Sequence, residues 1–331
     1  MDTNQMRQIS VIEPIGAAIE KTKQILFQPF DITKWFAIGF CAFLATLGNG
    51  GWPNAGGGGG QRGGHPQDFQ NQINTIKNSV LDNLPIIISV AAVVLLLILV
   101  ISVVLMWVKS RGQFMFLHCV ARNVAEVKNP WKHYAQQANS LFLFKLALWA
   151  AGFVGAMLFI IPLVMIGTCF VRVGIELFPL ANILWVFLLI FGIIVVAVAI
   201  GTVKLLTNEF VVPIMYLRGC FVKDAWRECW QLLMSNKGPF TLYLLFLLVI
   251  GLAIGMIVLL AVLVTCCCAA CFLMIPYIGT VVMLPILVWR RAYSLLYLSQ
   301  YGPEFDVFVP EPTPIVVPTA SIPPIGPEHN P

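Results

Sequence analysis

Long apolar stretches alternate with shorter polar connectors along this chain of 331 residues. Most of the stretches reach the length of about 20 residues that a helix needs to cross a bilayer. They predict six membrane-spanning helices, over residues 33–48, 85–108, 141–167, 183–203, 240–264 and 272–289. The stretch at 33–48 is short and can span only if the polar residues at its two ends lie at the headgroups. The expected fold class is an all-α integral membrane helical bundle over residues 1–302.

A sequence motif recurs in two of the polar connectors. Phe114 and Phe210 each stand eight residues before an arginine. Further along, residues 127–131 (VKNPW) correspond to residues 222–226 (VKDAW). The two connectors therefore look like copies of one unit.

A third copy of the motif is divided between the two ends of the chain. Residues 293–302 match its first half, and residues 11–15 (VIEPI) match its second half. In this alignment Gly302 takes the place of Asn123 and Gly219. We predict three repeated units, each a cytoplasmic amphipathic helix followed by a pair of apolar helices.

The second half of each copy predicts an amphipathic helix at the membrane surface. Residues 14–28 place their apolar side chains on one helical face and two lysines on the other. Asn129 before Pro130 predicts the start of the equivalent helix, since asparagine is a good N-cap and proline suits the first helical position.

Two segments of biased composition lie outside the predicted spans. Residues 48–66 form a glycine-rich loop, which we interpret as a flexible linker because it lacks the Gly-Lys-Ser/Thr sequence of a phosphate-binding loop. Residues 303–331 are rich in proline and predict a disordered cytoplasmic tail.

Composition and charge agree with a membrane protein and give its orientation. Hydrophobic residues make up 59% of the chain and charged residues 11%, whereas soluble domains have about 25% charged residues. With six spans, 17 of the 20 lysines and arginines fall on one side of the membrane. The positive-inside rule places that side, and both chain termini, in the cytoplasm. The net charge of +5 then follows from topology, and we expect no nucleic-acid partner.

Cations and tryptophans gather in the two central connectors, at the predicted inner membrane surface. Tryptophan is typical of membrane interfaces, and each cation near anionic lipid contributes about 1 kcal/mol. We name the candidate headgroup-binding residues the collar: Arg111, Arg122, Lys128, Trp131, Arg218, Lys223, Trp226 and Arg227. The expected partner is the lipid bilayer, including its anionic headgroups.

Small residues recur at four-residue spacing within the predicted spans. Examples are Gly251 with Gly255 and Ala197 with Gly201. Such spacing lets helices approach closely, so it predicts packing within the bundle or in a homo-oligomer.

No cofactor or metal site is expected from the sequence. Cys266, Cys267, Cys268 and Cys271 are close enough in sequence to suggest a metal site. Adjacent cysteines on a helix point in different directions, however, and in apolar surroundings cysteine behaves as a small hydrophobic residue. Ion or proton transfer would need carboxylates near mid-membrane, and the spans supply none.

Catalytic motifs are also missing from the sequence. A membrane enzyme would need a pair of histidines or carboxylates at the inner interface, where His118, Glu126, His133 and Glu228 are the available groups. We expect no enzymatic activity.

Several short runs resemble a bacterial family of uncharacterised polytopic membrane proteins. They are SRGQFMFL, NPW and NSLFLF, then PIMYLRG, and finally YLSQYGPEFDVF. That family is similar to the membrane domain found beside some glycerophosphodiester phosphodiesterases. The resemblance covers residues 10–308 and implies a six-helix domain in the bacterial cytoplasmic membrane. This chain lacks the histidine and acidic motifs of the catalytic barrel, so no catalytic residue is carried over.

The leading functional hypothesis is a non-enzymatic membrane scaffold or lipid-interacting protein. A small-molecule or lipid transporter, with a cavity between the repeats, is an alternative. Three repeats in one orientation differ from the inverted pairs of many transporters. A membrane-embedded lipid-processing enzyme is the other alternative.

Overall fold

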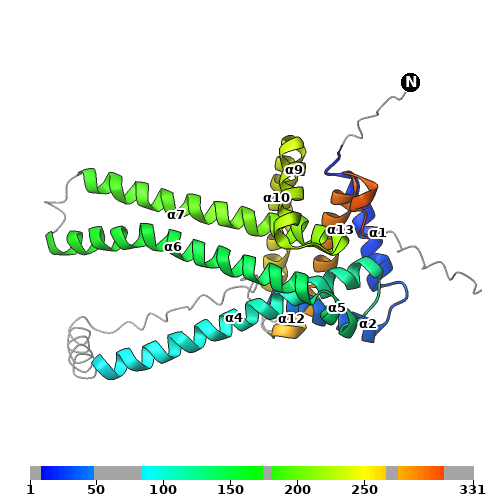
Figure 1. Ribbon diagram of the computed structural model, residues 1–331, viewed down its shortest axis with the longest axis horizontal. Coiled ribbons are helices and arrows are strands. Elements are labelled where there is room, and N and C mark those ends of the chain that lie inside the picture. The colour runs from blue at the N-terminus through cyan, green and yellow to red at the C-terminus, as the bar shows by residue number, and fades with distance from the viewer. Residues whose placement is uncertain (1–8, 48–83, 174–179, 266–274, 309–331) are drawn as a thin grey trace, which may run out of the picture.

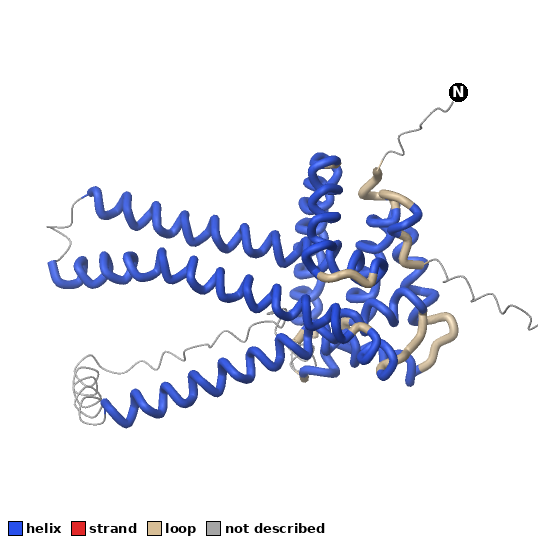
Figure 2. The backbone as a smooth tube through the Cα atoms, in the orientation of Figure 1, coloured by secondary structure: helices blue, strands red, loops and turns tan. Residues whose placement is uncertain are grey.

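The computed structural model describes residues 9–47, 84–173, 180–265 and 275–308. Within these ranges every regular element is a helix (Figure 2), so the all-α prediction is confirmed. The first helices are α1 (Glu13–Leu26), α2 (Ile32–Thr46), α4 (Leu84–Arg122), α5 (Lys128–His133), α6 (Ala135–Val173) and α7 (Leu180–Leu206). A π-helical turn η1 (Thr207–Val211) leads into α8 (Val212–Arg218). The chain continues through α9 (Val222–Ser235), α10 (Lys237–Val264), α12 (Pro276–Val282), α13 (Leu284–Ser299) and the 3-10 turn η2 (Pro303–Phe305).

Four helices of the described ranges are long and apolar enough to cross a membrane: α4, α6, α7 with its continuation through α8, and α10. Almost none of their most apolar surface is buried inside the protein. Leu95, Leu158 and Leu252 expose 69%, 70% and 67% of their surface. Apolar surface this extensive is compatible with lipid rather than water as its solvent. The chain is therefore a membrane protein.

The first and last predicted spans form shorter helices. The stretch at 33–48 becomes α2, whose 15 residues extend about 22 Å, less than a bilayer core of about 30 Å. The stretch at 272–289 is divided at Met283 between α12 and α13, just before Pro285. The two short helices α2 and α12 pack on each other, with Tyr277 Oη donating to the Phe36 carbonyl at 2.8 Å.

A compact body of helices, which we call the hub, lies at one end of α4, α6 and α7, and these three helices extend away from it as arms (Figure 1). The hub contains α1, α5, η1, α8, α9, α13 and the adjoining ends of the arms and of α10. Its core includes Phe114, Phe210, Tyr243, Tyr293 and Tyr297, each 0% exposed. The rings of Tyr243 and Tyr297 stack with centroids 4.2 Å apart. Helix α4 does not end at residue 108, as the apolar stretch predicted, but continues to Arg122 because its last turns are buried in this core.

The aligned motif positions have related surroundings in the hub. Phe114, Phe210 and Tyr293 are all fully buried. Asn123 and Gly219 have φ of 56° and 62°, so the same left-handed turn ends α4 and α8. Gly302 differs, since its φ of 158° is close to extended backbone.

The two ends of the described chain are joined through α1 and α13. Tyr293 Oη donates to the Val11 carbonyl at 3.0 Å. The Gln300 side chain accepts from the Ser10 amide at 2.8 Å and donates to the Ser10 carbonyl at 2.9 Å. The halves of the motif that are split between residues 293–302 and 11–15 therefore lie side by side.

The start of α5 differs from the prediction. The helix begins at Lys128 after Val127, and no side chain caps it. The Asn129 side chain donates instead to Glu126 Oε2 at 3.0 Å, so the prediction of Asn129 as the N-cap was wrong. Pro130 lies in the first turn, where a missing N–H is tolerated.

Some predicted features fall outside the described residues: the glycine-rich loop at 48–66, the cysteines at 266, 267, 268 and 271, and the tail beyond 308. The first residues of the predicted tail are packed on the hub, where Phe305 and Val307 are each 4% exposed. The boundary at 303 was therefore placed too early for an unpacked tail, because two apolar side chains after it join the core.

Candidate functional site

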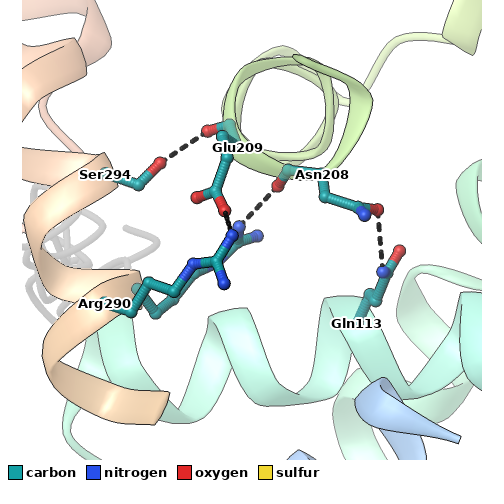
Figure 3. Close-up of polar contacts among 6 residues, drawn as sticks. Gln113, Asn208, Glu209, Arg290 and Ser294 are labelled. Atoms are coloured by element: carbon teal, nitrogen blue, oxygen red, sulfur yellow. Dashed lines mark hydrogen bonds and ion pairs between the residues drawn. The ribbon is translucent and has the colours of Figure 1, made fainter. Parts of the chain in front are cut away.

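A network of polar side chains lies inside the hub where η1, α4 and α13 meet (Figure 3). Gln113 of α4 donates through Nε2 to Asn208 Oδ1 at 2.9 Å. Arg290 of α13 forms an ion pair with Glu209 of η1 at 2.9 Å. These contacts connect three segments that are far apart in the sequence. We call this group, with Arg291, Ser294 and Lys145, the hub network.

The π-helical geometry of η1 explains how α13 binds to it. A π turn departs from the i→i−4 pattern of an α-helix, and two carbonyls in this turn accept hydrogen bonds from α13. Arg291 Nη1 donates to the Asn208 carbonyl at 2.6 Å, and Ser294 Oγ donates to the Glu209 carbonyl at 2.7 Å. The irregular turn is thus fixed in place by side chains of a second helix.

The hub network carries more positive than negative charge. The Glu209 carboxylate raises the pKa of the Arg290 guanidinium. Burial lowers the pKa of Arg291, and its buried Nε finds no hydrogen-bond partner among the described residues. The amine of Lys145 donates to Gln113 Oε1. An anion at the base of the arms would therefore be stabilised electrostatically.

Within the collar, Arg111 and Trp131 are brought together. The Arg111 guanidinium lies 4.7 Å from the ring centroid of Trp107 and 5.1 Å from that of Trp131. Its Nη1 donates to the Trp131 carbonyl at 3.2 Å. Trp107 was missing from the collar; its position one helical turn before Arg111 would have identified it as a neighbour.

The other collar residues do not join this cluster. Arg218 pairs with Glu228 at 2.9 Å and lies over the Phe305 ring at 5.5 Å. Trp226 packs beside Phe144, with centroids 5.9 Å apart. Arg122 is half-buried at the end of α4, and Lys128, Lys223 and Arg227 are exposed. The collar is therefore distributed over α4, α5, α8 and α9 rather than built as a single pocket.

The groups considered for catalysis take part in structural contacts. His118 Nδ1 lies 3.0 Å from Tyr216 Oη, and the His133 ring packs edge-on against Tyr134, with centroids 4.7 Å apart. The carboxylates of Glu126 and Glu228 accept hydrogen bonds from Asn129 and Arg218. In the described ranges, no group of three or more histidines, cysteines or carboxylates is arranged to hold a metal ion.

An open groove of about 380 Å³ lies between α6 and α7. Its lining includes small residues of both helices, such as Gly152 and Gly201, and Lys204 lines its hub end. Small residues also bring these helices together elsewhere, since a Cβ at Gly155 would lie 3.3 Å from Val196. By contrast, a Cβ at Gly251 or Gly255 would meet nothing within 4 Å, so this pair packs on no other described helix.

Comparison with known proteins gives a family over most of the chain. Residues 9–284 match a family of unknown function, DUF7544. The chain belongs to this family. No curated protein and no solved structure matches it. The family match does not bear on the resemblance to the membrane domain of glycerophosphodiester phosphodiesterases, which stays a prediction.

The DUF7544 region contains most of the groups described above. It includes Gln113 and Glu209 of the hub network, the whole collar and the α6–α7 groove. It ends at Leu284, the first residue of α13. Arg290 and Arg291 therefore reach the hub network from outside the matched region.

Proposed function

We propose that this DUF7544 protein is a non-enzymatic membrane scaffold whose hub faces the cytoplasm and binds anionic lipid headgroups of the inner leaflet. The observation that carries the proposal is the Arg111 guanidinium, which lies against the indoles of Trp107 and Trp131. Arginine and tryptophan with this geometry are typical of the level at which hydrocarbon meets headgroups.

The position of this cluster along α4 supports that assignment. Before it, Val104 and Leu105 are 52% and 38% exposed and would contact lipid; after it, Phe114 and Leu117 are 0% exposed in the hub core. Arg111 thus lies where α4 passes from an apolar, exposed surface to a buried one. A long cationic side chain at that level can keep its charge at the headgroups.

Exposed cations on the hub surface supply the attraction for anionic lipid. Helix α9 buries Val222, Ala225 and Cys229 against the hub, while Lys223 and Arg227 of the same helix are exposed. With Lys128 they make three cations, each contributing about 1 kcal/mol near an anionic surface. Together they favour anionic over zwitterionic lipid by roughly 3 kcal/mol, or about a hundredfold.

The proposal extends to topology. A topology of six spans with both termini in the cytoplasm needs two spans in addition to the four long helices. In this proposal α2 and the segment containing α12 supply them as a short pair. Three repeated units would be built around Phe114, Phe210 and Tyr293, with the third unit assembled from α13 and α1. Contacts across the hub, such as those of Glu209 with Arg290, favour a scaffold over a transport path between the repeats.

Binding of phosphatidylglycerol and phosphatidylcholine to the purified protein, compared by native mass spectrometry, tests the proposal. The triple variant K128Q/K223Q/R227Q should lose most of the preference for phosphatidylglycerol. The matched variant K128R/K223R keeps the charges and should bind as the wild type does. An unchanged preference in the triple glutamine variant would exclude these cations as the headgroup-binding residues.

A further inference from the structure

The α6–α7 groove combines an apolar wall with a cationic end. Leu148, Phe153, Ile193 and Ile200 supply apolar side chains along it. Lys204, in the last turn of α7, is the one charged residue in its lining. The groove therefore offers two different environments to a single elongated molecule.

The length of the groove corresponds to one leaflet of a bilayer. Its lining on α7 extends from Ile193 to Lys204, which is about 16 Å at 1.5 Å per residue. Half of a hydrocarbon core of about 30 Å is about 15 Å. Its volume of about 380 Å³ is within the range of about 300–1,000 Å³ for small-molecule sites.

Further positive charge lies near the hub end of the groove. Lys145 precedes the lining residue Leu148 by one helical turn on α6. Lys204 therefore offers a positive charge at the end of the groove nearest the hub, and Lys145 lies one helical turn beyond the lining on α6, so an anion would be attracted to this end.

We propose that the α6–α7 groove binds an anionic phospholipid of the inner leaflet, with one acyl chain along the groove and the phosphate at Lys204. The inference rests on the proposed function, because it requires the hub end of α6 and α7 to lie at the cytoplasmic headgroups. The groove would be one defined lipid site on the arms, in addition to the collar cations that are spread over the hub surface.

Each part of the phospholipid corresponds to a feature of the groove. A free phosphate ion would leave the apolar wall unoccupied. A neutral lipid would cover the wall but leave Lys204 without a counter-charge. A second copy of the chain would have to present both an apolar ridge and an anion, whereas the α10 surface around Gly251 and Leu252 is apolar only.

Filling the groove with a side chain tests the site. Gly201 lines the groove, and a Cβ there would meet nothing within 4 Å, so Gly201→Leu should fold normally and occupy the space of the acyl chain. Gly251→Leu on α10 is the matched control, since that position is equally open but lies outside the groove. Both variants should retain the wild-type unfolding temperature.

The readout is the number and affinity of phosphatidylglycerol molecules that remain bound in native mass spectrometry. We expect Gly201→Leu to lose one tightly bound phosphatidylglycerol, with at least a tenfold weaker affinity, and Gly251→Leu to retain it. Lys204→Gln should weaken phosphatidylglycerol binding by about fivefold and leave phosphatidylcholine binding unchanged. Wild-type lipid binding in Gly201→Leu would overturn the proposal.

Two further outcomes would assign the groove differently. Displacement of the lipid by inorganic phosphate alone would show that the anion, and not the acyl chain, is recognised. A wild-type dimer that Gly201→Leu dissociates, without any loss of lipid, would assign the groove to a second copy. Failure of the collar proposal can be distinguished from failure of the groove proposal. If only the collar proposal fails, K128Q/K223Q/R227Q binds lipid normally while Gly201→Leu still loses one lipid molecule.

Discussion

The ion pair between Glu209 and Arg290 should contribute more to stability than any other charge pair described in the hub. Glu209 is nearly buried, with 7% of its side chain exposed, while Arg290 is 48% exposed. The substitution Glu209→Gln keeps the shape and one acceptor but removes the charge. Among the described residues, no other carboxylate pairs with Arg290 or Arg291, so their positive charge would then lack a partner. Matched to it is Glu228→Gln, which removes the charge from a pair with 30% and 43% of its two side chains exposed.

The expected magnitudes follow from these exposures. Removing one partner of a fully buried pair costs about 3–5 kcal/mol, but the exposed half of Arg290 is screened by water, so a smaller value applies. A hydrogen bond to a charged group is worth about 1.5–3 kcal/mol, and we expect about 2 kcal/mol for Glu209→Gln. Exposed pairs contribute about 0.2–1 kcal/mol, so Glu228→Gln should cost about 0.5 kcal/mol.

Thermal unfolding in one detergent, followed by intrinsic fluorescence, measures the difference. Scan rate must be held constant, because membrane proteins often unfold irreversibly and the apparent Tm then depends on it. At roughly 2–4 °C per kcal/mol, Glu209→Gln should lower the Tm by about 4–8 °C and Glu228→Gln by no more than about 2 °C. Equal shifts in the two variants would show that the difference in burial between the two ion pairs has no energetic effect.

Three further perturbations test other parts of the hub. Gly112→Ala would place a Cβ 2.5 Å from the backbone of α2 and should cost about 1–3 kcal/mol, measured as a lower Tm, whereas Gly255→Ala, at an open position, should not. Arg111→Lys removes the planar contact with two indoles and should cost about 1 kcal/mol; an unchanged Tm would show that the stacking adds nothing. Burial raises the pKa of the Cys229 thiol to about 12, so iodoacetamide should alkylate it slowly at pH 8 and faster as the pH rises from 9 towards 12. Rapid alkylation of Cys229 in the folded protein at pH 8 would contradict the burial of its thiol.

Much of the helical architecture could be predicted from the sequence. Apolar stretches indicated the helices that became α4, α6, α7 and α10, because lipid-exposed helices are apolar on all sides and their length is set by the bilayer. Helix ends were harder to predict. Residues 109–122 of α4 are polar in part, and only their burial against the rest of the hub makes them a continuation of the same helix.

The candidate site could be predicted only in outline. Arg111 and Trp131 lie in one polar connector, and its content of cations and tryptophans was enough to predict that both lie at the same membrane surface. The hub network could not be predicted from the sequence. Gln113, Glu209 and Arg290 are far apart in sequence, and each looks like an ordinary residue near a helix end. Its π turn also has no sequence signal, because it depends on side chains that α13 supplies to the carbonyls of Asn208 and Glu209.

In the proposed topology, the long helices cross the membrane with the hub on the cytoplasmic side. Thiol accessibility in intact spheroplasts measures this topology. It uses single cysteines in place of Ser235 on the hub surface and Glu176 between α6 and α7, in a variant free of the nine natural cysteines. An impermeant reagent should label position 176 in intact cells and position 235 only after lysis. Labelling of position 235 in intact cells would place the hub outside and contradict both the topology and the inner-leaflet lipid site.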